Sequence, residues 1–104
     1  MIHEKTFIHA TGRVIKIIVK GYISPEESSI RTELEVLIKE PKEEYFHAPI
    51  GPAHPQFWKL KKLNKDQAKQ LQKSYSGVTD KQINSVLKEF DEIAHSLCCF
   101  SHFI

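Results

Sequence analysis

The chain has 104 residues, of which 40% are hydrophobic and 27% are charged, and its formal net charge is +2. These values are typical of one globular domain and argue against a disordered chain or several independently folding domains. The longest apolar stretch, VIKIIV, contains a lysine and is much shorter than the roughly 20 residues that a membrane-spanning helix needs.

Two strands open the predicted fold. Residues 12–23, GRVIKIIVKGYI, are rich in β-branched residues, and residues 3–10 form a partner strand that joins them through a turn at Thr11–Gly12. Apolar side chains fall on both faces of the second strand, with Ile15 on one face and Ile18 on the other. This pattern predicts a central strand that is covered on both sides.

Residues 24–41 fit both a helix and a strand. Ser24 and Glu27 would form a capping box at the start of a helix. A strand is favoured by the alternation of charged residues with Ile30, Thr32, Leu34, Val36 and Ile38. We favour the strand, with the preceding SPEESS as a hairpin loop.

That hairpin has consequences for the charges and for the rest of the sheet. Charged side chains would meet across the ladder, with Arg13, Lys16 and Lys20 facing Glu33 and Glu35. Residues 44–50, EYFHAPI, would add a short fourth strand. Residues 47–55 contain three prolines and predict a stiff connection to the second half of the chain.

The second half is predicted to be helical. Residues 55–63 form one or two amphipathic turns, and a helix over 65–75 is capped by Asn64 and ended by Gly77. Thr79 begins the last helix through a capping box with Gln82.

The last helix carries a regular apolar stripe: Ile83, Val86, Phe90, Ile93, Leu97, Phe100 and Ile104. The spacing alternates between three and four residues, as in the seam of a coiled coil. The stripe therefore predicts a long helix that covers one face of the sheet. Part of the stripe is also a candidate dimer interface, because a small sheet does not cover three heptads of apolar surface.

The end of the chain, AHSLCCFSHFI, holds a candidate metal site. On a continuous helix Asp91, His95, Cys99 and His102 form one exposed column, and residues four apart can share a metal ion. A straight helix cannot surround a tetrahedral ion, so a closed site would need ligands from a second chain or from elsewhere in this one, where His47 and His54 could supply them. The alternative is that these histidines are surface residues near the end of a helix, where the helix dipole favours them.

Residues 55–73 hold six lysines and one aspartate, which makes them a candidate nucleic-acid surface. Such a stripe beside an exposed Trp58 could follow a phosphate backbone. The candidate residues are Lys59, Lys62, Lys65, Lys69 and Lys73. The alternative is an ordinary solvated helix face, and the segment has no arginine for bidentate reading of guanine.

No catalytic motif is present in the sequence. It has no glycine-rich phosphate loop, no Gly-x-Ser-x-Gly elbow and no His-Glu-x-x-His motif. The N-terminus does not resemble a secretory signal, and the only two cysteines are adjacent, so we expect a reduced, cytoplasmic compartment. We therefore predict a non-catalytic protein without a cofactor.

Together these patterns predict a single α+β domain over residues 1–104. An antiparallel sheet of three to four strands in the N-terminal half packs against two or three C-terminal helices. The leading functional hypothesis is an interaction module that binds a protein partner or a second copy of itself, through Trp58, Phe100 and Phe103. Nucleic-acid binding and metal binding are the alternatives, and no membrane partner is expected.

Overall fold

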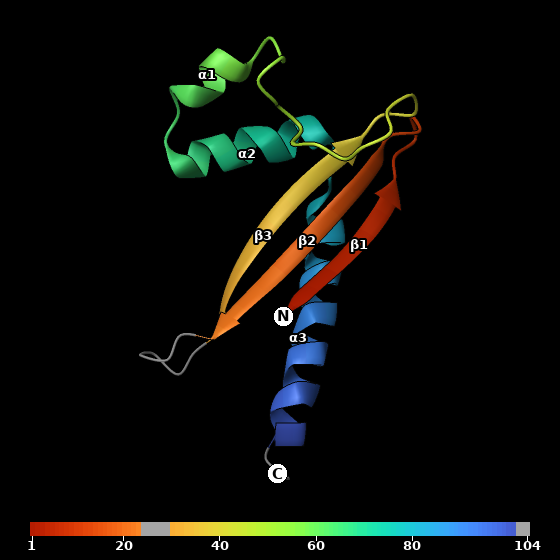
Figure 1. Ribbon diagram of the computed structural model, residues 1–104, viewed down its shortest axis with the longest axis vertical. Coiled ribbons are helices and arrows are strands. Elements are labelled where there is room, and N and C mark those ends of the chain that lie inside the picture. Colours follow the sequence, from red (N-terminus) through yellow and green to blue (C-terminus); the bar gives the residue numbers. More distant parts are fainter. Residues whose placement is uncertain (24–29, 102–104) are drawn as a thin grey trace.

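The computed structural model describes residues 1–23 and 30–101, with side chains for 1–22 and 31–94. Three strands form an antiparallel sheet of order β1-β2-β3, and three helices follow, which confirms the predicted α+β fold (Figure 1). The elements are β1 (Ile2–Ile8), β2 (Val14–Ile23), β3 (Ile30–Lys39), α1 (Phe57–Lys61), α2 (Lys65–Ser76) and α3 (Asp80–Ser101). None of the helices in the described part of the chain is long and apolar enough to cross a membrane.

β1 and β2 form the predicted hairpin. The turn is closed by backbone hydrogen bonds from the N–H of His9 to the C=O of Arg13 and from the N–H of Gly12 to the C=O of His9. Gly12 has a φ of 90°, a left-handed conformation that glycine adopts without steric cost. The turn therefore lies where the sequence places it.

The segment that fitted both a helix and a strand is β3, so the strand hypothesis is confirmed for residues 30–39. β3 pairs with β2 in a regular antiparallel register that places Lys20 opposite Glu33, as predicted. The same prediction is wrong for Lys16, which lies opposite Leu37, and for Arg13, which pairs with Glu40. Glu35 lies opposite Ile18, but the Nζ atom of Lys20 reaches its carboxylate at 3.7 Å. The SPEESS loop lies outside the described residues.

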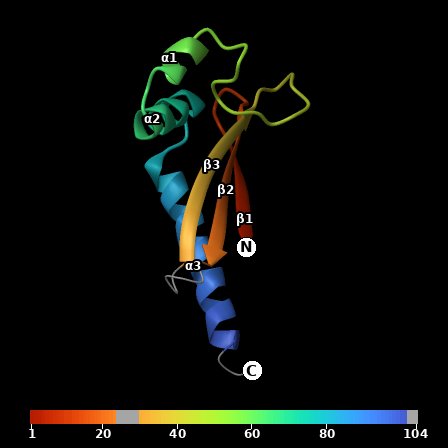
Figure 2. The same ribbon diagram turned by 60° about the vertical axis from the view of Figure 1, so that its left-hand side comes forward.

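The prediction that both faces of β2 are covered is wrong. Ile15, Ile17 and Val19 are completely buried, whereas Val14 and Ile18 on the opposite face are partly exposed. In both ribbon views α3 runs along only one face of the sheet (Figures 1 and 2). The outer face is tolerated in water because charged residues alternate with its apolar ones.

The predicted fourth strand is reduced to a single bridge between Ile38 and His47, which exchange two backbone hydrogen bonds of 2.9 Å. Two residues later the chain reaches Pro49, which has no N–H group to donate to a ladder. Pro49 and Ile50 are buried, so the chain turns away from β3 at this point.

The helix boundaries follow the predicted capping signals. Asn64 and Gln67 form a capping box at the start of α2, and Gly77 ends the helix with a φ of 81°. At the start of α3 the Thr79 Oγ1 accepts from the N–H of Gln82 at 3.1 Å, and the Gln82 side chain accepts from the N–H of Thr79 at 3.0 Å.

The buried line along α3 differs from the predicted stripe at one residue. Ile83, Val86, Phe90 and Ala94 are buried against the sheet, whereas Ile93 is 40% exposed. A straight helix turns by about 100° per residue, so Ala94 lies about 40° from Phe90 and Ile93 about 60° away on the other side. The side chains of Leu97, Phe100 and Ile104 lie outside the described residues, although the helix itself continues to Ser101.

Candidate interaction site beside the third strand

The free edge of the sheet is the outer side of β3. Ile38 exchanges its hydrogen bonds with His47 on that side, so in the regular register Thr32, Leu34 and Val36 also direct their N–H and C=O groups there. Within the described part of the chain, no hydrogen bond reaches these outward-facing groups. The edge from Thr32 to Val36 is about 14 Å long.

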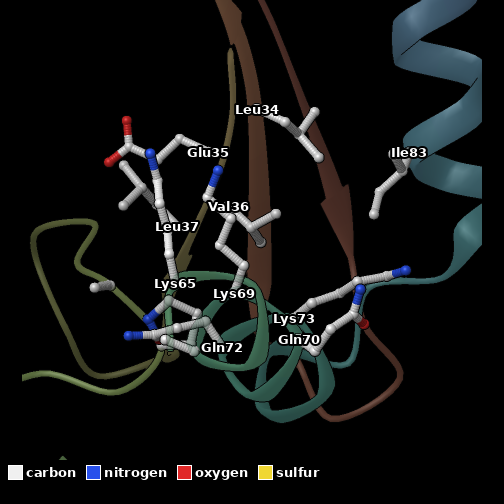
Figure 3. A pocket seen from close by; sticks show the side chains of 13 residues that line it. Leu34, Glu35, Val36, Leu37, Lys65, Lys69, Gln70, Gln72, Lys73 and Ile83 are labelled. Carbon is white, nitrogen blue, oxygen red and sulfur yellow. The ribbon is translucent and has the colours of Figure 1, made fainter. Parts of the chain in front are cut away.

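A cavity of about 570 Å³ lies between this edge, α2 and the start of α3 (Figure 3). Its apolar lining includes Leu34 and Val36 of β3, Ala68 of α2 and Ile83 of α3. Figure 3 shows the Leu34 and Ile83 side chains directed toward one another across it. We call this hollow, together with the free edge of β3, the β3 groove.

Lysines of α2 form the rim of the β3 groove. Lys65, Lys69 and Lys73 all line it, and in Figure 3 the Lys65 and Lys69 side chains extend from α2 beside β3. Lys73 forms an ion pair with Asp80. Among the described residues, neither Lys65 nor Lys69 forms an ion pair, and Glu35 is the one acidic residue of the lining, so the groove carries a net positive charge.

The position of α2 is fixed by hydrogen bonds to the rest of the fold. The Gln72 side chain accepts from the N–H of Ile50 at 2.7 Å and donates to its C=O at 3.1 Å. At the end of α2 the Arg13 guanidinium donates to the C=O of Tyr75 at 2.8 Å and to Glu40 at 2.5 Å. These contacts make the groove a preformed feature of the fold.

The predicted lysine face is divided between two places. Lys65, Lys69 and Lys73 belong to the β3 groove, whereas Lys59 lies on α1 and Lys62 follows that helix as its C-cap. Neither Lys59 nor Lys62 lines the groove. The sequence therefore identified the groove lysines but not the apolar surface beside them.

Of the three predicted interaction residues, the structure describes the side chain of Trp58 alone. Trp58 lies on α1 with 70% of its surface exposed, and the Lys61 ammonium lies 5.4 Å from its ring centroid. α1 and the C-terminal end of α3 lie at opposite ends of the long axis (Figure 1). The side chain of Phe100 and all of Phe103 lie outside the described residues.

The candidate metal ligands stay untested, because the side chains of His95 and Cys99 and the whole of His102 lie outside the described residues. Within the described residues no group of three or more His, Cys, Asp or Glu side chains is placed to hold a metal ion. His47 contacts Glu43 and the backbone of Ala48. The His54 ring packs edge-on against the Tyr75 ring, with 4.5 Å between the ring centroids. The two loop histidines therefore do not converge on one ligand position.

A cluster of three charged side chains joins β1 to α3. Glu89 lies 2.7 Å from the Lys5 ammonium and 2.9 Å from the His3 imidazole. Lys5, and then His3, hold the pKa of Glu89 below its usual range. The contact ties β1 to α3 across the inner face of the sheet.

Sequence reasoning missed the free edge of β3 and its apolar neighbours Leu34 and Val36. The alternating pattern predicted the strand, but only the order of strands shows that β3 is at an edge. Pro49, inside the predicted fourth strand, was the one available signal that this edge stays open.

Comparison of the chain with protein-family models, with curated proteins and with solved structures gives no match.

Proposed function

We propose that this chain is a non-catalytic interaction module that binds a peptide segment of a protein partner in the β3 groove. The proposal rests on one observation: a sheet edge that is unpaired within the described residues opens into an apolar hollow rimmed by lysines, of which Lys65 and Lys69 form no ion pair there. Hollows of this size that are mostly apolar and carry a few polar groups are typical of binding sites. Unpaired strand edges are also the surfaces to which extended peptides add.

An experiment on the wild-type chain and two variants tests this function. A displayed library of random peptides is selected on the wild-type protein, and the affinities of enriched peptides are measured by fluorescence anisotropy. Ala68→Trp fills the groove, because Ala68 lines it. Ala53→Trp makes the same change at an exposed loop position outside the groove lining. We expect the peptides to lose at least about tenfold in affinity for the Ala68 variant only.

Two results would contradict the proposed function. One is a selection that yields no peptide binding the wild type more tightly than a Kd of about 1 mM. The other is a set of peptides whose affinities for the two tryptophan variants are equal. Circular dichroism and thermal melting of both variants show whether each keeps its fold.

Nucleic-acid binding through the lysines of 59–73 is the second candidate, supported by the exposed Trp58 beside Lys61. Attraction to phosphate is long-ranged and does not depend on the groove. Glutamate substitutions at Lys59 and Lys62 would therefore weaken binding of single-stranded oligonucleotides as much as those at Lys65 and Lys69. Equal losses for both pairs would favour this function over peptide binding.

A further inference from the structure

We infer that the ligand of the β3 groove is an extended acidic peptide that adds to β3 as a fourth, antiparallel strand. The inference rests on the proposed function and specifies its ligand. Three features support it: the direction of the free backbone groups, the pairing already begun by His47, and the charge of the rim. Each limits the kind of ligand that can occupy the groove.

The backbone of β3 offers a regular ladder to an added strand. The outward N–H and C=O groups of Thr32, Leu34 and Val36 repeat every second residue, which is the spacing of an antiparallel partner. The same three residues direct their side chains to the inner face, on which Ile15 and Ile17 are buried. A peptide residue opposite Leu34 would therefore place its own side chain in the apolar hollow.

The chain itself shows the direction of the missing strand. His47 pairs with Ile38 in an antiparallel bridge, and the pairing stops because Pro49 follows. The open edge at Val36 begins where this bridge ends. A peptide that continues the same antiparallel ladder toward Thr32 meets no hydrogen-bonded segment of the described chain.

The charges favour an acidic peptide. Among the described charged residues that line the groove, Glu35 is the one acid, and its carboxylate lies 3.7 Å from the Nζ of Lys20, which is outside the lining. Lys65 and Lys69 have no such partner within the described residues. Carboxylates in the peptide would therefore neutralise the two lysines, at distances over which salt screening is incomplete.

A second copy of the chain is a poorer occupant of the same edge. Pairing β3 with β3 would bring the Lys65 and Lys69 side chains of the second copy to a groove that already carries a net positive charge, and like charges repel. Lysines at a free edge commonly prevent such self-pairing. Homodimerisation through β3 is therefore disfavoured, although other surfaces stay open to it.

Synthetic peptides test both the chemistry and the mode of binding. The probes are capped peptides in which isoleucine alternates with threonine and both ends carry two glutamates or, as the charge control, two lysines. With isoleucine opposite Leu34 in antiparallel addition, the isoleucine N–H groups face β3 and the threonine N–H groups face away, so that threonine and not an acid lies opposite Glu33 and Glu35. Methylating the isoleucine nitrogens should abolish binding, and methylating the threonine nitrogens should preserve it.

Amide exchange on the protein gives an independent measurement. On binding of the acidic peptide, exchange should slow at Thr32, Leu34 and Val36, whose amides are free. Glu33 and Glu35 should change little, because their amides already face β2. Slowing that does not alternate along β3 would overturn the inference.

Two charge-reversed proteins test the rim. Glutamate at both Lys65 and Lys69 should weaken the acidic peptide by about tenfold or more and strengthen the basic one. The same reversal at Lys59 and Lys62, which do not line the groove, should change neither affinity by more than about twofold.

The outcomes separate this inference from the proposed function. If peptides selected from the library bind the groove but methylation of their backbone nitrogens does not change their affinity, strand addition is wrong and the proposed interaction module is retained. The same holds if the basic peptide binds the wild type more tightly than the acidic one. If the selection itself yields no groove-dependent peptide, the proposed function fails and the inference fails with it.

Discussion

At the scale of single residues, the pair formed by Glu43 and His47 braces the loop that ends the sheet. The imidazole Nε2 lies 2.8 Å from the Glu43 carboxylate and Nδ1 lies 2.7 Å from the C=O of Ala48. Both ring nitrogens face acceptors, so the protonated imidazolium is favoured. The Glu43 carboxylate, and then the Ala48 carbonyl, raise the pKa of His47 above its usual value of 6.5.

The brace is strongest in a limited range of pH. The N–H of Glu40, and then His47, lower the pKa of Glu43 below 4.5. The stability that Glu43 contributes is therefore present above 4.5 and lost as pH falls through its lowered pKa. The contribution of His47 is present below 6.5 and lost as pH rises through its raised pKa. The brace is thus fully formed between these two values.

We predict that an NMR titration of the His47 ring will give a pKa above 6.5. Glu43→Gln should return this pKa toward 6.5, because the amide attracts the imidazolium less than a carboxylate does. Glu44→Gln, at the exposed neighbouring acid, is the control and should leave the His47 titration unchanged. A His47 pKa that does not respond to Glu43→Gln would show that the brace is not formed in solution.

At the scale of elements, α3 is held by the residues it buries rather than by its whole apolar stripe. Val86 and Phe90 are almost completely buried against β1 and β2, and Ala94 continues their line. The sequence predicted that Ile93 would take part, because a seam of period 3.5 was assumed. A single straight helix on a sheet follows its own period of 3.6 instead.

Two identical substitutions in α3 test this register. Ile83→Ala removes a buried side chain and should lower the free energy of unfolding by about 2–5 kcal/mol. Ile93→Ala, made in the same helix at a residue that is 40% exposed, should cost about 1 kcal/mol or less. Helix propensity changes equally in both, so the difference reports burial alone. Denaturant unfolding measures the difference in the free energy of unfolding between the two variants. Equal losses would show that Ile93 is part of the buried stripe, as the sequence predicted.

At the scale of the whole molecule, the fold is more elongated than a compact domain with the same number of residues. The radius of gyration is 16.1 Å and the longest extent is 52 Å, whereas a compact domain of 100 residues has a radius of gyration of about 13 Å. The buried core joins the inner face of the sheet to the first four turns of α3. α1 has no buried residue. Homodimerisation through other surfaces stays a prediction.

This distribution of burial predicts an uneven stability. The amides of Ile15–Val19 in the central strand should exchange with solvent only through global unfolding. Exchange there requires the buried side chains to become exposed and the hydrogen bonds to the neighbouring strands to break. Amides of α1 should exchange fastest among the helices. Hydrogen exchange followed by NMR measures both, with the free energy from denaturant unfolding as the reference. Protection in α1 equal to that in β2 would contradict this picture.

The sequence by itself determined the class of fold and the ends of most elements. Local chemistry was sufficient there: β-branched residues and alternation identified the strands, and Gly12, Asn64 and Gly77 marked a turn and the ends of α2. Lys65 and Lys69 could also be selected from charge spacing alone.

Only the tertiary structure decided which face of β2 is covered and which strand edge stays open. Both depend on where α3 and the chain after Pro49 lie relative to the sheet. Pro49 marks only the point at which pairing to β3 stops, and no local pattern encodes where the following chain and α3 pack. The hollow beside Leu34 and Val36 exists because α2, which follows β3 by 25 residues in the chain, is held next to it. Gln72 bonds Ile50, and Arg13 donates both to the end of α2 and to Glu40, which directly follows β3. Long-range packing therefore places the lysines of α2 along one wall of the β3 groove.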